Sequence, residues 1–227
     1  IAASARASLP ESAFNNQDIT NTAWALAPRR LHDTPLLEAL SAAALPMMLQ
    51  FVPQDLANTA WAFAKLVVRD SPLFEALAAA SRAKLAEGDP QNWANLAWSW
   101  ATLKVKNVPL MQSISAQSLT SMKDFGPQEL ANIAWSCAHL LFFDAPLLHA
   151  PSRAAITTLK GGCVQNVTNT AWAFAQLKYK NTTFFNSISS EVIANLSAYR
   201  ERDMSIMAWS FARREVRDDT LMDAIAS

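Results

Sequence analysis

The chain has 227 residues, of which 51% are hydrophobic and 17% charged, and its formal net charge at pH 7 is +0. This composition excludes an intrinsically disordered chain, and the neutral charge gives no global attraction to nucleic acid or to a membrane. Only 4 residues are glycine, which is few for an all-β chain with many tight turns. The two cysteines, Cys137 and Cys163, stand in unrelated contexts and predict no disulfide framework.

Six tryptophans divide the chain into units of 37 residues without any insertion. The segments around them are NTAWALA, NTAWAFA, NLAWSWA, NIAWSCA, NTAWAFA and IMAWSFA. The repeat tryptophans are Trp24, Trp61, Trp98, Trp135, Trp172 and Trp209. A fixed period of this length is typical of a helical-repeat protein. Every repeat position below is counted from its tryptophan, so position −3 lies three residues before it.

The whole chain, 1–227, is predicted to be a single helical-repeat array. Residues 1–15 are interpreted as the tail of a preceding repeat. The following repeats run near 16–52, 53–89, 90–126, 127–163, 164–200 and, in part, 201–227. Because neither end resembles a polar cap, we expect more chain, or a partner, at both ends.

Each repeat is predicted to contain two helices. The first spans about position −7 to +8, because apolar residues at −5, −1, +2, +5 and +7 have helical spacing. Pro53, Pro90 and Pro127 stand at its first position, where proline loses no hydrogen bond. The second helix follows an unbroken column of residues that cap helix N-termini: Asp33, Asp70, Asn107, Asp144, Asn181 and Asp218.

One helix pair cannot bury its own apolar face, but stacked pairs can. The predicted fold is therefore all-α, an αα-superhelix in the form of a right-handed solenoid of helix-turn-helix repeats. The repeat tryptophans are predicted to pack in its core, because small residues at −4 and +3 leave room for the indole. A stacking surface for nucleobases is the rejected alternative, since the surrounding helix face is rich in alanine.

Position −3 carries asparagine in five repeats: Asn21, Asn58, Asn95, Asn132 and Asn169. Asparagine is a poor helix former, so its recurrence in mid-helix needs a cause. Two interpretations remain open. The amides form a hydrogen-bonded ladder between repeats, or they lie on the concave surface and bind a ligand.

Positions −7, −3, +1, +4 and +8 are predicted to form one polar helix face. Position +4 varies: Pro28, Lys65, Thr102, His139, Gln176 and Arg213. Position +8 is mostly basic: His32, Arg69, Lys106, Phe143, Lys180 and Arg217. Constant packing beside one variable polar position is the pattern of a modular RNA reader. The candidate RNA-binding residues are the asparagine column, the +4 residues from Lys65 onward, and the +8 residues except Phe143.

Positions +4 to +8 hold 11 of the 19 Lys and Arg residues and one acid, Glu215. This basic stripe suits contacts with phosphates, although the helix dipole also favours cations in a last helical turn. The fourth repeat breaks the stripe with His139 and Phe143. That interruption indicates either a stacking position or a patch that contacts protein.

Nothing in the sequence supports catalysis. His32, His139 and His149 occupy repeat positions that ordinary polar residues fill elsewhere, and there is no glycine-rich phosphate loop. Cys137 and His139 are two residues apart on a helix, which is a poor geometry for a shared metal, and Cys137 fills an apolar column. We therefore expect no enzyme activity, no metal site and no cofactor.

The core motif PQ-x-L-A-N-x-A-W, as in residues 53–61 and 127–135, resembles the heptatricopeptide repeat. The resemblance covers essentially the whole chain, whereas the related octotricopeptide repeat has one more residue per unit. It implies an organellar protein, mitochondrial or alternatively plastid, that binds RNA, and some such proteins carry a C-terminal RAP domain. The sixth repeat departs from the pattern, with Ile206 at −3 and Arg202 at −7.

Two functions follow as hypotheses. The first is an organellar single-stranded RNA-binding protein that acts in RNA processing, stability or translation, or as an rRNA-binding subunit associated with a ribosome. The alternative is a scaffold subunit of a large assembly, in which the solenoid groove holds a peptide or a helix. The expected partners are single-stranded RNA or an rRNA segment and neighbouring proteins, with no insertion into a membrane.

Overall fold

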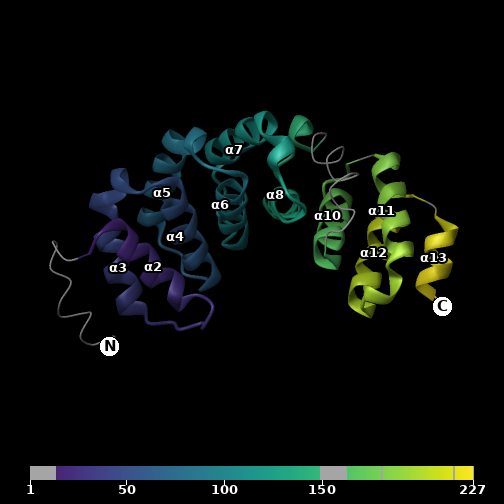
Figure 1. Cartoon of the computed structure of the whole chain (residues 1–227), viewed down its shortest axis with the longest axis horizontal. Coiled ribbons are helices and arrows are strands. Elements are labelled where there is room, and N and C mark those ends of the chain that lie inside the picture. Colours follow the sequence, from purple (N-terminus) through teal and green to yellow (C-terminus); the bar gives the residue numbers. More distant parts are fainter. Residues whose placement is uncertain (1–13, 149–162, 180, 217, 227) are drawn as a thin grey trace. The chain divides into compact units, whose positions relative to one another are not determined.

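The computed structural model describes residues 14–148, 163–179, 181–216 and 218–226. All regular secondary structure in these ranges is helical (Figure 1). The first helices of the repeats are α2 (Asn16–Leu26), α4 (Pro53–Lys65), α6 (Pro90–Thr102), α8 (Pro127–Leu140), α10 (Val164–Gln176) and α12 (Glu201–Arg213). The second helices are α3 (Thr34–Met47), α5 (Ser71–Lys84), α7 (Val108–Thr120), α11 (Thr182–Ala194) and α13 (Asp219–Ala226).

Short 3-10 turns follow four of the second helices: η1 (Met48–Gln50), η2 (Leu85–Glu87), η3 (Met122–Asp124) and η4 (Leu196–Ala198). Most of the second helix of the fourth repeat lies outside the described residues. So does the predicted tail of a preceding repeat, apart from its last two residues, of which Asn15 caps α2.

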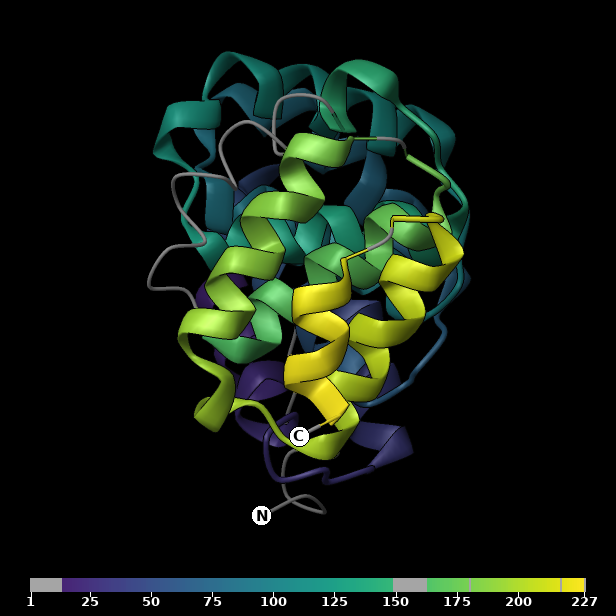
Figure 2. The ribbon, with the colours of Figure 1, turned by 90° about the vertical axis from the view of Figure 1, so that its right-hand side faces the viewer.

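The chain forms two compact units that divide between Gln117 and Ser118, in the last turn of α7. In the N-terminal unit α2 packs on α4 and α4 on α6, while α3 packs on α5. In the C-terminal unit α8 packs on α10 and α10 on α12, and α11 packs on α13. Figure 2 shows α11, α12 and α13 in the foreground. Within each unit, the predicted stacking of helix pairs in sequence order is confirmed.

The predicted N-cap column is confirmed in all six repeats. Each capping side chain accepts a hydrogen bond from the backbone N–H three residues later, at 2.9 to 3.1 Å. The residue at that third position is buried in every repeat and begins the apolar face of the second helix. The cap therefore fixes where the second helix starts and which side chains it turns toward the first helix.

The first helices end earlier than the sequence predicted. They stop at position +4 in four repeats, +2 in the first and +5 in the fourth, not at +8. The residue at +6 is left-handed in every repeat, with φ between 51° and 57°. The +7 N–H then donates to the +2 carbonyl, as from Val68 to Phe63 at 2.9 Å. This closure ends the helix, so position +8 lies in the turn and not on the predicted helix face.

Glycine usually occupies such a left-handed position, but none of the six residues here is glycine. They are Arg30, Val67, Lys104, Leu141, Lys178 and Glu215. Val67 is the most strained type, because a β-branched side chain clashes with its own backbone at positive φ. Its side chain is 67% exposed, so little packing would be lost on its removal.

We expect Val67→Gly to raise the free energy of unfolding by about 1 kcal/mol, because glycine relieves this strain. Urea denaturation measures the change. The matched control is Ala79→Gly on the exposed face of α5, which should cost about 1 kcal/mol through lost helix propensity. Equal destabilisation by both substitutions would refute the strain argument.

The core lies between the first and second helices of each unit. In the N-terminal unit Trp100 is fully buried and its ring meets that of Phe74 edge-on at 4.9 Å. In the C-terminal unit a run of ring contacts at 4.6 to 5.4 Å joins Phe174, Phe184, Phe185 and Phe211. The predicted core position of Cys137 is confirmed: burial, with a smaller contribution from the Asp144 charge, raises its pKa to about 12.

Candidate nucleic-acid interface

The repeat tryptophans do not lie in the core, and the prediction that they do is wrong. Trp24 is 50% exposed and Trp209 40% exposed, and the four between them are partly exposed. The core position is instead +2, where Phe63, Trp100 and Phe174 are buried. On a helix of 3.6 residues per turn, positions 0, −7, +4 and −3 fall within about 60° of one another. The indoles therefore border the polar face that the sequence identified.

An open groove lies on this face in the N-terminal unit, over α2, α4 and α6. Its volume is about 620 Å³. The −3 and −7 amides of consecutive repeats line it, together with the half-exposed indole of Trp24: Asn21, Asn58, Asn95, Gln54 and Gln91. Glu87 and Asp89 form an acidic rim at the helix N-termini. The structure thus brings three predicted asparagines from three repeats to one surface.

A second groove lies on the equivalent face of the C-terminal unit, between α10 and α12. Its volume is about 580 Å³. Gln165 and Asn169 line it from the fifth repeat, and Arg202 and Ile206 line it from the same two columns of the sixth. The departures of the sixth repeat from the pattern therefore give this groove a cation and an apolar side chain where the first groove has amides.

The asparagine column makes no side-chain hydrogen bond within the part of the chain that the structure describes. Hydrogen bonds between repeats join other columns. Thr20 and Thr59 share a buried hydrogen bond of 3.1 Å between α2 and α4. The Asn16 amide donates to the Asp55 carboxylate at 2.7 Å. These contacts between α2 and α4 come from positions −8, −6, −4 and −2, and Lys84 of the second repeat also donates to the Leu49 and Phe51 carbonyls of the first.

Two side chains at position +4 pack on the repeat indoles. The centroid of the exposed His139 ring lies 3.8 Å from that of Trp135 and 5.0 Å from that of Trp172. The Arg213 guanidinium carbon lies 5.2 Å from the centroid of the Trp209 ring, a cation–π geometry. Of the other predicted residues at this position, Lys65 is exposed, and Thr102 and Gln176 are partly exposed.

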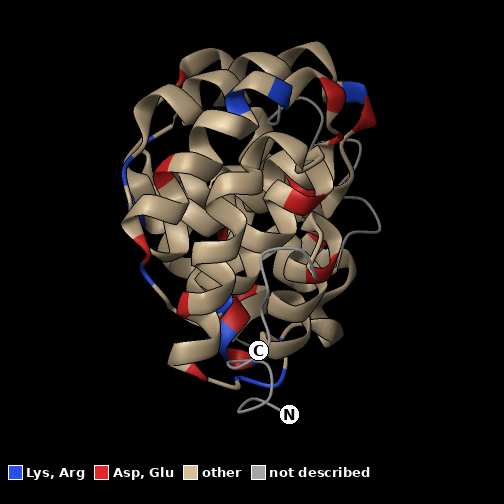
Figure 3. Ribbon diagram, turned by 90° about the vertical axis from the view of Figure 1, so that its left-hand side faces the viewer, with Lys and Arg blue, Asp and Glu red and all other residues tan. Residues whose placement is uncertain are grey.

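The predicted basic residues at +8 lie at the edge of the repeats, in the turn between the two helices. His32, Arg69 and Lys106 are exposed, whereas Lys180 and Arg217 lie outside the described residues. Figure 3 shows Lys and Arg positions on connecting turns at the edge of the N-terminal unit. These cations therefore flank the groove side chains and do not share their helix face.

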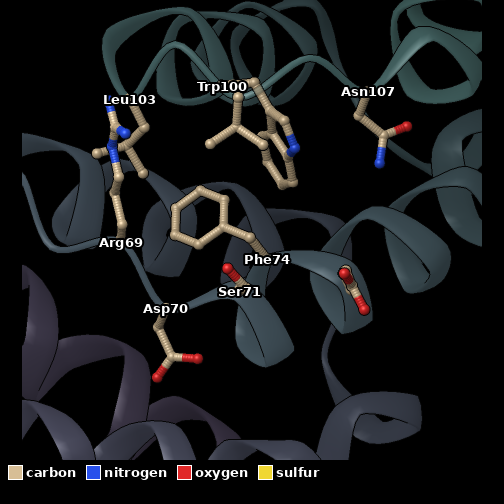
Figure 4. A pocket seen from close by; sticks show the side chains of 9 residues that line it. Arg69, Asp70, Ser71, Phe74, Trp100, Leu103 and Asn107 are labelled. Carbon is tan, nitrogen blue, oxygen red and sulfur yellow. The ribbon is translucent and has the colours of Figure 1, made fainter.

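Arg69 also borders a smaller cavity of about 210 Å³ between α5 and α6. Figure 4 shows Phe74 and Trp100 pointing toward one another, with Arg69 beside Leu103 and Asn107 on the other side. The cavity is lined by core aromatic residues and polar side chains of the turns, and none of its lining residues belongs to the −7 or −3 columns.

The sequence prediction rejected the tryptophan column as a stacking surface and placed it in the core. The signal was present, because a helical period places the indole about 40° from position +4 and about 60° from position −3. The glutamines at −7 were placed on the polar face, but they were not chosen as candidate residues. Trp24 of the tryptophan column and Gln54 and Gln91 of the glutamine column line the N-terminal groove.

No described helix is long and apolar enough to span a membrane. Among the described residues, no three His, Cys, Asp or Glu side chains are grouped in a way that could hold a metal ion. His149 lies outside those residues.

The fold and the grooves define an all-helical repeat protein whose first helices carry amides and partly exposed indoles on one face. The chain belongs to the family of the RNA-editing substrate-binding complex 6 protein, whose model matches residues 2–108 and 95–219. No curated protein matches the chain.

Proposed function

We propose that this chain binds single-stranded RNA along the first-helix face, as a component of a multi-protein RNA-editing substrate-binding complex. The family to which the chain belongs, described by the name of such a complex, supports this role. The observation that carries the proposal is the N-terminal groove, in which amides from three consecutive repeats lie beside a half-exposed indole.

The chemistry of the groove suits unpaired bases. A carboxamide both donates and accepts hydrogen bonds, so it matches the exposed edges of bases. An indole face stacks on any base. The cations in the turns lie to one side, where they attract the phosphate backbone, and the acids Glu87 and Asp89 at the rim keep phosphates out of the groove itself. Sequence-specific RNA recognition favours such a surface, because single strands expose their base edges.

The finer assignments are also proposals. The 37-residue period and the PQ-x-L-A-N-x-A-W motif support a repeat of the heptatricopeptide type. We propose a mitochondrial location, with the plastid as the alternative, and a role without catalysis in which neighbouring proteins of the complex share the RNA.

A scaffold role is the second candidate. The first-to-second helix turn of the fourth repeat exposes two large apolar side chains, Leu141 at 65% and Phe143 at 59%. Adjacent exposed apolar side chains favour contact with a protein over contact with phosphates. Binding of a protein at this turn and of RNA in the grooves is compatible with one chain.

The test is a gel shift with a random single-stranded RNA pool, using the chain and a variant with Asn21, Asn58 and Asn95 all changed to alanine. Each lost hydrogen bond is worth about 1 kcal/mol, so we expect the variant to bind about tenfold or more weakly. The salt dependence should be unchanged, because amides neutralise no phosphate.

The control for the amide variant is Gln112→Ala, which removes an exposed amide from α7 in the same unit. It should bind as the original chain does. If the asparagine variant also keeps full affinity, the groove is not the binding surface. If the original chain does not bind RNA even at low salt, the scaffold candidate is favoured.

A further inference from the structure

The groove between α10 and α12 lies at the N-terminal ends of both helices. The residues at these ends that line it are Cys163, Val164 and Gln165 of the fifth repeat and Arg200, Arg202 and Asp203 of the sixth. The first N–H groups of a helix have no acceptor within it, and they give this end a partial positive charge. In neither helix does the N-cap side chain accept a hydrogen bond from the first turn. Two helix ends of positive potential therefore border one groove.

Position −9, the N-cap of the first helix, distinguishes this groove from the N-terminal one. There the position is Asp89, whose carboxylate accepts a hydrogen bond from the Asn92 N–H at 2.8 Å. The protein thus supplies its own anion to the start of α6. At the start of α12 the same position is Arg200, which cannot supply one. The C-terminal groove therefore has a cation where the N-terminal groove has a carboxylate.

The charges that line the C-terminal groove favour an anion. Arg202 stands at position −7, which is glutamine in the other repeats, and both Arg200 and Arg202 are exposed. The Asp203 carboxylate also lines the groove and accepts a hydrogen bond from the Arg200 backbone N–H at 3.3 Å. Glu201 belongs to the same helical turn but does not line the groove. Two cations thus face one acid, in addition to the partial charge of the helix ends.

A buried hydroxyl in the same groove is an independent sign of a ligand. Thr168 lines the groove and is 2% exposed, and its Oγ1 has no hydrogen-bond partner among the described residues. The hydroxyls at the same position of two other repeats are satisfied. Thr20 donates to the Asn16 carbonyl at 2.9 Å. Ser205 donates to the Glu201 carbonyl at 2.8 Å. An unpaired buried hydroxyl lowers stability, so its presence at Thr168 calls for a partner from outside the chain.

We propose that the C-terminal groove binds a phosphate group of the RNA strand. Arg200 and Arg202 neutralise its charge, while the N–H groups at the starts of α10 and α12 and the Thr168 hydroxyl donate hydrogen bonds to its oxygens. A phosphate has several acceptor oxygens, so it suits a site composed of donors. The inference rests on the proposed RNA binding and gives the two grooves different ligands, bases for the amides of the N-terminal groove and a phosphate here.

Cys163 provides a direct probe of this groove. It is exposed and lines the groove, whereas Cys137 is buried and burial raises its pKa to about 12. A thiol reagent should therefore react with Cys163 and not with Cys137. The experiment measures the rate at which N-ethylmaleimide labels Cys163 in the full chain, with and without a short oligouridine that has hydroxyl ends. We expect saturating RNA to slow the labelling severalfold, because the bound strand covers the groove.

Arg202→Gln tests the charge, because it restores the residue that the other repeats have at position −7. Loss of one charged hydrogen bond should weaken RNA binding about tenfold. Loss of one phosphate contact should also reduce the slope of log affinity against log salt by about 0.7. Anisotropy of a labelled oligouridine measures both. The matched control is Arg82→Gln, which removes an exposed cation from α5 and should change neither.

Thr168→Val tests the hydroxyl, because valine keeps the shape of the side chain. RNA binding should weaken about fivefold or more, since a hydrogen bond to the phosphate is lost. The free energy of unfolding should not fall, because the hydroxyl has no partner among the described residues. Thr20→Val is the comparison, since it breaks hydrogen bonds to Asn16 and Thr59 and should lower that free energy. A purely structural role for Thr168 would instead lower stability and leave RNA affinity unchanged.

The outcomes separate the two proposals. If RNA binds and the asparagine variant weakens it, but RNA leaves Cys163 labelling unchanged and Arg202→Gln keeps the affinity and slope, the phosphate site is overturned and RNA binding stands. If the chain binds no RNA even at low salt, both proposals fail. Protection of Cys163 by polyglutamate but not by RNA would assign the groove to an acidic protein and overturn the inference. Protection by oligouridine with hydroxyl ends supports an internal phosphate, and protection only by a 5′-phosphorylated strand supports a terminal one.

Discussion

Replacing Trp100 by alanine is expected to lower the free energy of unfolding by about 3–5 kcal/mol. Its side chain is fully buried and packs edge-on against Phe74. The cavity that remains would join the existing space of about 210 Å³ at this point, so the neighbouring side chains cannot easily fill it. Urea denaturation followed by circular dichroism measures the loss.

Trp24→Ala provides the comparison, because Trp24 belongs to the repeat column and is 50% exposed. It removes the same number of atoms but only about half as much buried surface, so the free energy of unfolding should fall by less than about 2 kcal/mol. Its RNA affinity should fall even though its stability falls little. Similar stability losses for the two variants would contradict the assignment of position +2, and not the repeat tryptophan, to the core.

The second large effect concerns the cations at position +8. Changing Arg69, Lys106 and Lys180 together to alanine should weaken RNA binding by about an order of magnitude or more. Each phosphate contact on a single strand contributes about 0.7 to the slope of log affinity against log salt. Losing three contacts should therefore reduce that slope by about 2.

A salt titration of RNA affinity from about 50 to 200 mM measures this slope. The matched control changes Lys123 and Arg82 to alanine, since both are exposed cations near the ends of second helices. Because they lie away from the turns of the first helices, the slope should hardly change. If the triple variant keeps the affinity and slope of the original chain, phosphate contacts by these three cations are excluded.

Local signals in the sequence predicted most of the fold. The 37-residue period, the prolines that begin α4, α6 and α8, and the capping column each depend on a few adjacent residues. These signals act within one helical turn, so the helix starts can be predicted from them without knowledge of the packing. The helix pairs and the start of every described second helix follow from them.

The ends of the first helices could not be predicted in this way. The usual signal is glycine after the last helical residue, but position +6 holds residues such as Arg30, Val67 and Leu141. In the fifth repeat the buried side chain at +7, Tyr179, packs on Phe174 with the ring centroids 5.3 Å apart, which helps to hold the left-handed turn there. The left-handed residue at +6 moves position +8 off the predicted helix face in every repeat.

The candidate site was predicted in part. Asn21, Asn58 and Asn95 line a groove of the N-terminal unit, and the variable position +4 shares their helix face. The tryptophan column was assigned to the core because small residues at −4 and +3 leave room for an indole. Here Phe63, Trp100 and Phe174 already fill that space from position +2, which leaves the repeat indoles partly exposed. The spacing of the residues alone does not show which aromatic column, position 0 or position +2, occupies the core.

The most direct test of the account is photo-crosslinking of the full chain to single-stranded RNA that contains 4-thiouridine, followed by identification of the crosslinked peptides. The account predicts crosslinks in the segments around the repeat tryptophans, on α2, α4, α6, α8, α10 and α12. Crosslinks confined to the second helices, α3, α5, α7, α11 and α13, would contradict it, because the RNA would then lie on the opposite side of the repeats from the amides and indoles.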